Sequence, residues 1–180
     1  MFKAITYFIS VIILASITEV FAKSLRIHNV SPDLLLIYTL MFAYEENLVV
    51  VILLSFFSGL YVDFLLGVPV GSATTAIILI AIFTKMLAGR FAFFYRIWWR
   101  MPFLVSISTV FLYIFIYFCT YILSTLHIGS VTINTKLLIS RLPWLIGYNL
   151  AVTYLVYSFY KMVRLIQEMS ERKKKSGVGL

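Results

Sequence analysis

A single carboxylate lies inside a long apolar stretch between Ser55 and Gly71. Every fourth residue of this stretch is small or acidic, in the order Ser55, Gly59, Asp63 and Gly67. On an α-helix, residues at this spacing share one face. Three of them are small enough to let a neighbouring helix approach closely, and the fourth is ionisable and costly to expose to lipid. The spacing therefore predicts a helix face that is covered by protein.

The composition predicts a membrane protein. Of the 180 residues, 62% are hydrophobic and 12% are charged, and the mean hydropathy is +1.01, whereas soluble domains are about 45–50% apolar and about 25% charged. The net charge of +8 comes from basic clusters between and after apolar runs. This distribution is typical of membrane topology signals and not of a nucleic-acid-binding surface. We predict an all-α, polytopic integral membrane protein that binds no nucleic acid.

Signatures of enzymes and metal sites are missing from the sequence. The one cysteine, Cys119, lies in an apolar run and has no partner for a disulfide within the chain. The two histidines, His28 and His127, lie in polar connectors without paired acidic residues or cysteines. No nucleophile elbow, zinc-protease motif or phosphate-binding glycine loop occurs. We therefore predict no catalytic residue, no metal site and no cofactor.

Apolar runs separated by polar residues predict six membrane helices in a single domain at residues 1–164. The predicted spans are 4–22, 32–44, 48–66, 73–88, 103–126 and 143–160, and residues 165–180 form a polar, basic cytoplasmic tail. The apolar part of the second span, Leu34 to Tyr44, is shorter than the roughly 20 residues that cross a bilayer as a helix. This span has to rely on a locally thin bilayer or on packing against protein.

The basic residues predict the orientation of the spans. With a cytoplasmic N-terminus, 11 basic residues fall on the cytoplasmic side and 4 on the opposite side. The positive-inside rule therefore places both termini in the cytoplasm. The turn from Gly67 to Gly71, which contains Pro69 and requires unusual backbone angles, then faces outward. Asp63 lies about one helical turn below that outer surface.

Asp63 has polar neighbours at a similar predicted depth. We predict that Asp63 pairs with Asn149 or with an arginine, which would fix the packing of the helices; a proton or cation site is the alternative. The candidate cluster consists of Glu19, Arg26, Asp63, Arg141 and Asn149.

Three further segments are candidate contact surfaces. Gly147 and Ala151 form a second small-residue face in the last span, suited to another helix of this chain or to another protein's helix, and internal packing is favoured. Glu45 and Glu46 are expected in a solvated cytoplasmic turn, and pairing with Arg90, Arg96 or Arg100 on the same side is the alternative. A mixed basic and aromatic segment before the fifth span predicts contact with the lipid bilayer interface, through Arg90, Arg96, Trp98, Trp99 and Arg100.

One family shares the pattern around Asp63. Pro32-Asp33-Leu-Leu-Leu opens the short second span, and the segment from Phe56 to Gly71 is Phe-Phe-Ser-Gly-Leu-Tyr-Val-Asp-Phe-Leu-Leu-Gly-Val-Pro-Val-Gly. This pattern resembles the rod shape-determining protein family MreD, which shows a Pro-Asp-Leu-Leu opening, then Gly-x-x-x-Asp, and then Gly, a small residue, Pro and Gly. The length and the number of spans are similar too, whereas from Gly89 onward the likeness is only architectural.

The resemblance implies a fold, a location and partners. Proteins similar to MreD lie in the bacterial inner membrane, and their fold resembles the six-helix substrate-binding subunits of energy-coupling-factor vitamin transporters. They associate with MreC, a bitopic protein, and belong to the cell-elongation machinery with RodA, penicillin-binding protein 2 and MreB filaments. The expected function is a scaffold that helps to regulate peptidoglycan synthesis and cell shape. The alternatives are a vitamin-type substrate-binding subunit with an outward pocket near Asp63 and Asn149, and a proton-coupled carrier.

Overall fold

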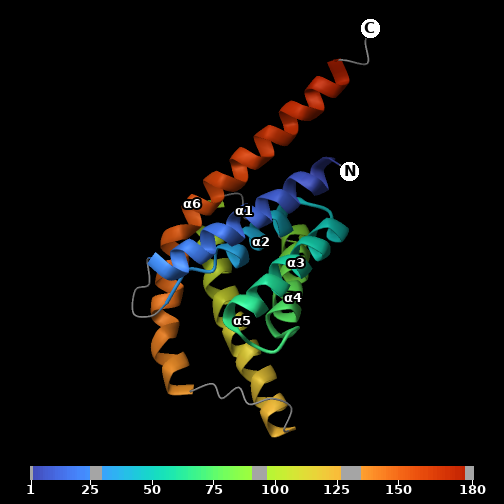
Figure 1. Cartoon of the computed structure of the whole chain (residues 1–180). Helices are drawn as coiled ribbons and strands as arrows, with labels where there is room; N and C mark the ends of the chain where they lie inside the picture. The colour runs from blue at the N-terminus through green and yellow to red at the C-terminus, as the bar shows by residue number, and fades with distance from the viewer. Residues whose placement is uncertain (1, 25–29, 91–96, 127–134, 177–180) are drawn as a thin grey trace.

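The computed structural model describes residues 2–24, 30–90, 97–126 and 135–176, and within these segments its regular structure consists of helices joined by short turns, without a β-strand (Figure 1). The prediction of an all-α fold is confirmed. The helices are α1 (Phe2–Ser24), α2 (Leu34–Glu45), α3 (Leu48–Leu66), α4 (Ser72–Arg90), α5 (Ile97–Thr125) and α6 (Thr135–Ser176).

The helix bounds agree with the predicted spans except in the last two helices. α3 has the predicted bounds, and α1, α2 and α4 differ from them by one or two residues at each end. α5 begins earlier than its predicted span, and α6 runs for 42 residues through most of the predicted tail. The tail continues the helix because it is rich in Met, Leu, Gln, Glu, Lys and Arg, which favour helices, and contains no glycine before Gly177.

Two helices within the described residues are long and apolar enough to cross a membrane. They are α3, Leu48–Leu66, and the Met101–Thr125 part of α5. The other apolar helical segments are shorter, namely Thr6–Val20, Leu34–Glu45 and Ser72–Ala88. The structure therefore shows an all-helical fold with two helices of membrane-spanning length.

α2 is enclosed by the rest of the bundle. Ten of its 12 residues, Leu34 to Ala43, are buried, and α2 contacts all five other helices (Figure 1). A helix that is apolar all round is suited to burial. Packing against protein therefore accounts for the short apolar run that the sequence shows between Pro32 and Glu45.

A tight turn folds α4 back against α3. At the end of α3, Gly67 has a left-handed backbone with a φ of 62°. Its N–H donates to the carbonyl of Phe64, and the N–H of Val68 donates to the carbonyl of Asp63. These two bonds form a Schellman motif, which ends a helix at a left-handed residue. Gly71, with a φ of 101°, then leads the chain into α4.

Candidate functional site

Asp63 binds the N-terminus of α4 across this turn. The residue is 1% exposed. Its Oδ1 accepts a hydrogen bond from the N–H of Ala73 at 2.6 Å. Its Oδ2 accepts from the N–H of Gly71 at 2.8 Å, and from the N–H and the hydroxyl of Thr74 at 3.2 and 2.5 Å. The first N–H groups of a helix lack partners within the helix, and negative charge is stabilised there. Asp63 is therefore a helix cap that the preceding helix supplies.

The same face of α3 meets the backbone of α4. A Cβ atom at Gly59 would lie 2.4 Å from the Cα of Thr74, which leaves no room for a side chain. Ser55, one turn earlier, is fully buried. The face that carries Ser55, Gly59 and Asp63 is thus covered by this chain itself. Gly67 does not belong to the packing face as predicted: no atom lies within 4 Å of a Cβ at this position, and the residue ends the helix instead.

A second buried polar cluster joins the start of α2 to α5 and α6. The Oδ1 of Asn149 accepts from the backbone N–H of Asp33 at 2.8 Å, and its Nδ2 donates to the hydroxyl of Thr109 at 2.9 Å. Asn149 Nδ2 and the hydroxyl of Tyr113 each lie 3.4 Å from the Asp33 carboxylate. Asn149 and Thr109 are fully buried. The cluster therefore anchors the N-terminus of the central helix inside the bundle, directly after the buried Pro32.

The predicted pairing of Asp63 with Asn149 is wrong. The partners of Asp63 are α4 groups, and the partners of Asn149 are Asp33 and Thr109. The physical reason is the turn after α3, because it brings the unpaired N–H groups at the start of α4 next to Asp63. Asn149 instead meets the backbone N–H that the start of α2 leaves free.

The other members of the predicted cluster do not surround Asp63 in the described part of the chain. Glu19 is exposed and lies near the hydroxyl of Tyr61 on α3. That hydroxyl donates to the backbone carbonyl of Ala15 at 2.9 Å. Arg141 is half-buried and forms no ion pair with Asp63. Arg26 lies outside the described residues.

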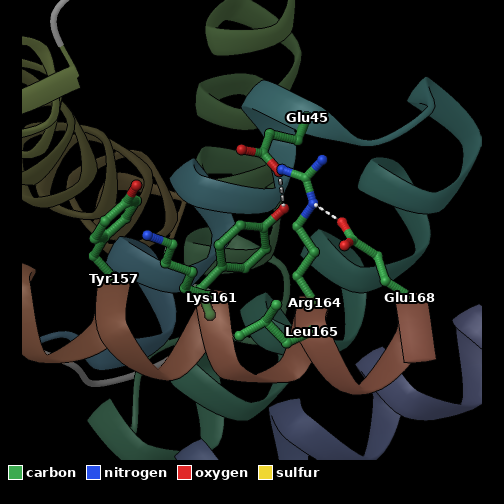
Figure 2. A pocket seen from close by; sticks show the side chains of 7 residues that line it. Glu45, Tyr157, Lys161, Arg164, Leu165 and Glu168 are labelled. Carbon is green, nitrogen blue, oxygen red and sulfur yellow. Dashed lines mark hydrogen bonds and ion pairs between the residues drawn. The ribbon is translucent and has the colours of Figure 1, made fainter. Parts of the chain in front are cut away.

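Charged side chains line a groove at the other end of α2. Glu45 Oε2 accepts from the hydroxyl of Tyr160 at 2.8 Å and pairs with the guanidinium of Arg164, which also reaches Glu168 at 3.2 Å (Figure 2). The groove has a volume of about 240 Å³, and its remaining lining residues are Tyr157, Lys161 and Leu165. The Glu45 carboxylate raises the pKa of Arg164 further, so the guanidinium stays charged. These contacts hold α6 to the end of α2.

The neighbouring carboxylate is bound as well. The hydroxyl of Tyr7 on α1 donates to Glu46 Oε1 at 2.6 Å. The turn is solvated as expected, because Glu45 is exposed and Glu46 is half-buried. The two acids also connect α2 and its turn to α6 and α1, which the sequence analysis did not predict. A signal for these contacts was present in the sequence: Tyr7, Tyr160 and Arg164 lie near helix ends predicted on the same side of the membrane.

The second small-residue face, on α6, is open. Gly147 and Ala151 are exposed, and no atom lies within 4 Å of a Cβ at Gly147. The prediction that this face packs internally is wrong. Its physical reason is Asn149, whose bonds to α2 and α5 turn the opposite side of α6 inward. Val152 and Val156 are buried on that inward side.

The predicted membrane-interface side chains lie outside the described set, and their role stays a prediction. They belong to the end of α4, the segment 91–96 and the start of α5, and are Arg90, Arg96, Trp98, Trp99 and Arg100. Among the described residues, no group of three or more His, Cys, Asp or Glu side chains is placed to hold a metal ion. No family model, curated protein or solved structure matches this chain.

Proposed function

We propose that the chain is a six-span scaffold of the MreD type in the bacterial inner membrane, with both termini in the cytoplasm. It binds the transmembrane helix of an MreC-like bitopic partner and helps to regulate peptidoglycan synthesis and cell shape. The likeness between Pro32 and Gly71 motivates the choice of family. The protein catalyses no reaction in this proposal, and its work is helix–helix recognition.

The outer surface of the bundle supports a membrane location. Large apolar side chains face outward from three helices, and each is more than 40% exposed: Phe8, Ile12, Phe56, Phe111 and Phe118. Apolar patches of this kind mark interaction sites or aggregation hazards in water, whereas lipid solvates them. α2 is too short to cross lipid alone, and its enclosure by the other helices removes that requirement.

The observation that carries the scaffold role is the open face of α6. Small residues at Gly147 and Ala151 allow close approach of another helix, and no part of the described chain covers Gly147. The corresponding face of α3 is already covered by α4. A helix from another protein therefore finds its close-packing surface on α6.

The polar residues expected to line a ligand pocket have protein partners, which favours the scaffold over the transporter subunit and the carrier. Asp63 receives four hydrogen bonds from α4. Asn149 uses its amide oxygen and its amide nitrogen to hold α2 and α5. The groove described above lies at the other end of α2, beside Glu45.

Co-purification tests the proposal. The affinity-tagged chain is extracted from bacterial inner membranes together with the MreC-like protein of the same organism. Ala151→Leu fills the open face and is expected to lower partner recovery by about ten-fold, which corresponds to 1.4 kcal/mol of binding free energy. Ser16→Leu is the matched control, because Ser16 is also small and exposed but lies on α1.

Two results would contradict the proposed function. One is the absence of an MreC-like protein from the wild-type preparation, with the chain itself correctly folded. The other is uptake of a small molecule by vesicles that contain the chain, because a scaffold moves no solute.

A further inference from the structure

The exposed face of α6 continues as a regular seam. Among the exposed residues from Ala151 onward, one set recurs at alternating intervals of four and three: Ala151, Leu155, Ser158, Met162, Leu165 and Met169. We call these six residues the α6 seam. Leu155 and Met169 are 66% and 62% exposed. A repeat of 3.5 residues is the spacing at which two helices pack along one another over a long distance. The α6 seam therefore has the form of a helix-binding surface.

The C-terminal part of the α6 seam extends past the end of the bundle at which Arg164 pairs with Glu45. Arg164 pairs with Glu45 at the end of α2, so Leu165 and Met169 lie at or beyond this level. α6 continues from Leu165 to Ser176, a length of about 18 Å at 1.5 Å per residue. Figure 1 shows this part of the helix, in red, projecting past the N-terminus. In the proposed topology its apolar side chains stand outside the hydrocarbon core.

The charge of the C-terminal part of α6 indicates which kind of binding partner suits the α6 seam. Between Lys161 and Lys175 the chain has six basic and two acidic residues. Two parallel copies would bring these basic clusters together, and the repulsion disfavours a homodimer. The membrane surface is disfavoured as well, because the extension continues α6 away from the bundle and does not fold back along it (Figure 1). A different helix with acidic flanks complements both the apolar seam and the charge.

We propose that the α6 seam binds one continuous helix of the partner, which crosses the membrane beside Ala151 and continues in the cytoplasm as far as Met169. The cytoplasmic part of that helix has an apolar stripe flanked by acidic residues. Lys161, which makes no ion pair with the described residues, lies next to Met162 and is available to these acids. This inference rests on the proposed function, because it takes the bitopic partner as the protein on the open face of α6.

Photo-cross-linking in the co-expressed complex tests this proposal. The photoreactive residue p-benzoylphenylalanine is placed singly at Met162, Leu165 and Met169. Leu48 is the control site, because it is 47% exposed and begins α3 next to Glu46 and Asn47 at the same end of the bundle. Adducts with the partner are expected at the three seam sites at about ten times the control yield. Mass spectrometry should place them in the partner residues that precede its transmembrane helix.

Other adducts separate the competing occupants. Adducts between two copies of the chain would overturn the proposal in favour of a homodimer. Lipid adducts, or yields equal to those at Leu48 while the partner still co-purifies, would overturn it and leave the proposed function standing. If no partner co-purifies, the proposed function and this proposal fall together.

A charge variant adds a second readout. Met169→Asp introduces an acidic group at an exposed position, so the thermal stability of the isolated chain should not change. Partner recovery should fall about ten-fold, because the variant places a charge inside an apolar seam. Partner recovery equal to that of the wild type would contradict a cytoplasmic continuation of the partner helix.

Discussion

The small-residue faces of α3 and α6 have similar spacing and opposite environments. On α3, Gly59 lies against the backbone of Thr74, and Asp63 caps the helix that covers it. On α6, Gly147 and Ala151 point away from the described chain. Small residues four positions apart permit close helix packing, but their spacing does not decide whether the packing partner belongs to the same chain.

The residues next to each face decide this. The turn from Gly67 to Gly71 is short, so α4 must return along α3. In α6, Asn149 lies midway between Gly147 and Ala151, about 200° around the helix from each of them. Because Asn149 is buried and bonded to other helices, the two small residues are turned outward. A polar residue between two small ones is therefore a usable sign of an open face.

The largest expected effect on stability comes from replacing one glycine with alanine on each face, which adds a single methyl group. Gly59→Ala places a Cβ 2.4 Å from a backbone atom of α4 and should destabilise the chain by about 3 kcal/mol or more. Gly147→Ala meets no atom and should leave stability unchanged or raise it by up to about 1 kcal/mol. Thermal unfolding in detergent measures both. Equal stability of the two variants would show that the two faces do not differ.

A second comparison concerns the cap that closes the α3 face. Asp63→Ala leaves the N–H groups of Gly71, Ala73 and Thr74 without their acceptor and should cost about 2–3 kcal/mol. Asp63→Asn keeps one acceptor oxygen and should cost less than Asp63→Ala. The midpoint of thermal unfolding distinguishes the two variants. If Asp63 served only to bind an ion, neither Asp63→Ala nor Asp63→Asn would lower the midpoint of thermal unfolding.

The turn that returns α4 to α3 should contribute less. Gly67→Ala forces a side chain into a left-handed backbone with a φ of 62° and should cost about 1–2 kcal/mol. Gly67→Asn should cost less, because asparagine tolerates this conformation. Chemical denaturation of the purified protein can resolve the difference. Identical stabilities of Gly67→Ala and Gly67→Asn would argue against a strained turn.

The smallest effect is expected at the charged end of α6. Glu45→Gln removes the ion pair with Arg164, whose side chain is 49% exposed, and should cost less than about 1 kcal/mol. The loss should shrink at high salt, because mobile ions screen exposed charges. Unfolding curves at low and high salt test this. A large, salt-independent loss would show that α6 is held mainly by this contact and not by Asn149.

The sequence predicted the helices and the turn better than the partners of the polar residues. Apolar runs and the Gly67–Gly71 pattern are local signals, and the structure has helices and a turn at those positions. The length of α6 was missed because its apolar character ends near Tyr160 while its helix propensity continues. Asp33 was noted only as part of a motif, because its contact with Asn149 depends on how α2 sits between α5 and α6.

The most direct test measures folding and partner binding together for one residue from each face. Gly59→Ala and Gly147→Leu are purified beside the wild type, and each preparation is assayed by size-exclusion chromatography and by recovery of the MreC-like partner. The account predicts that Gly59→Ala gives a smaller folded peak than the wild type, whereas Gly147→Leu keeps the folded peak and loses the partner. A folded peak of Gly59→Ala equal to that of the wild type, or full partner recovery with Gly147→Leu, would contradict it.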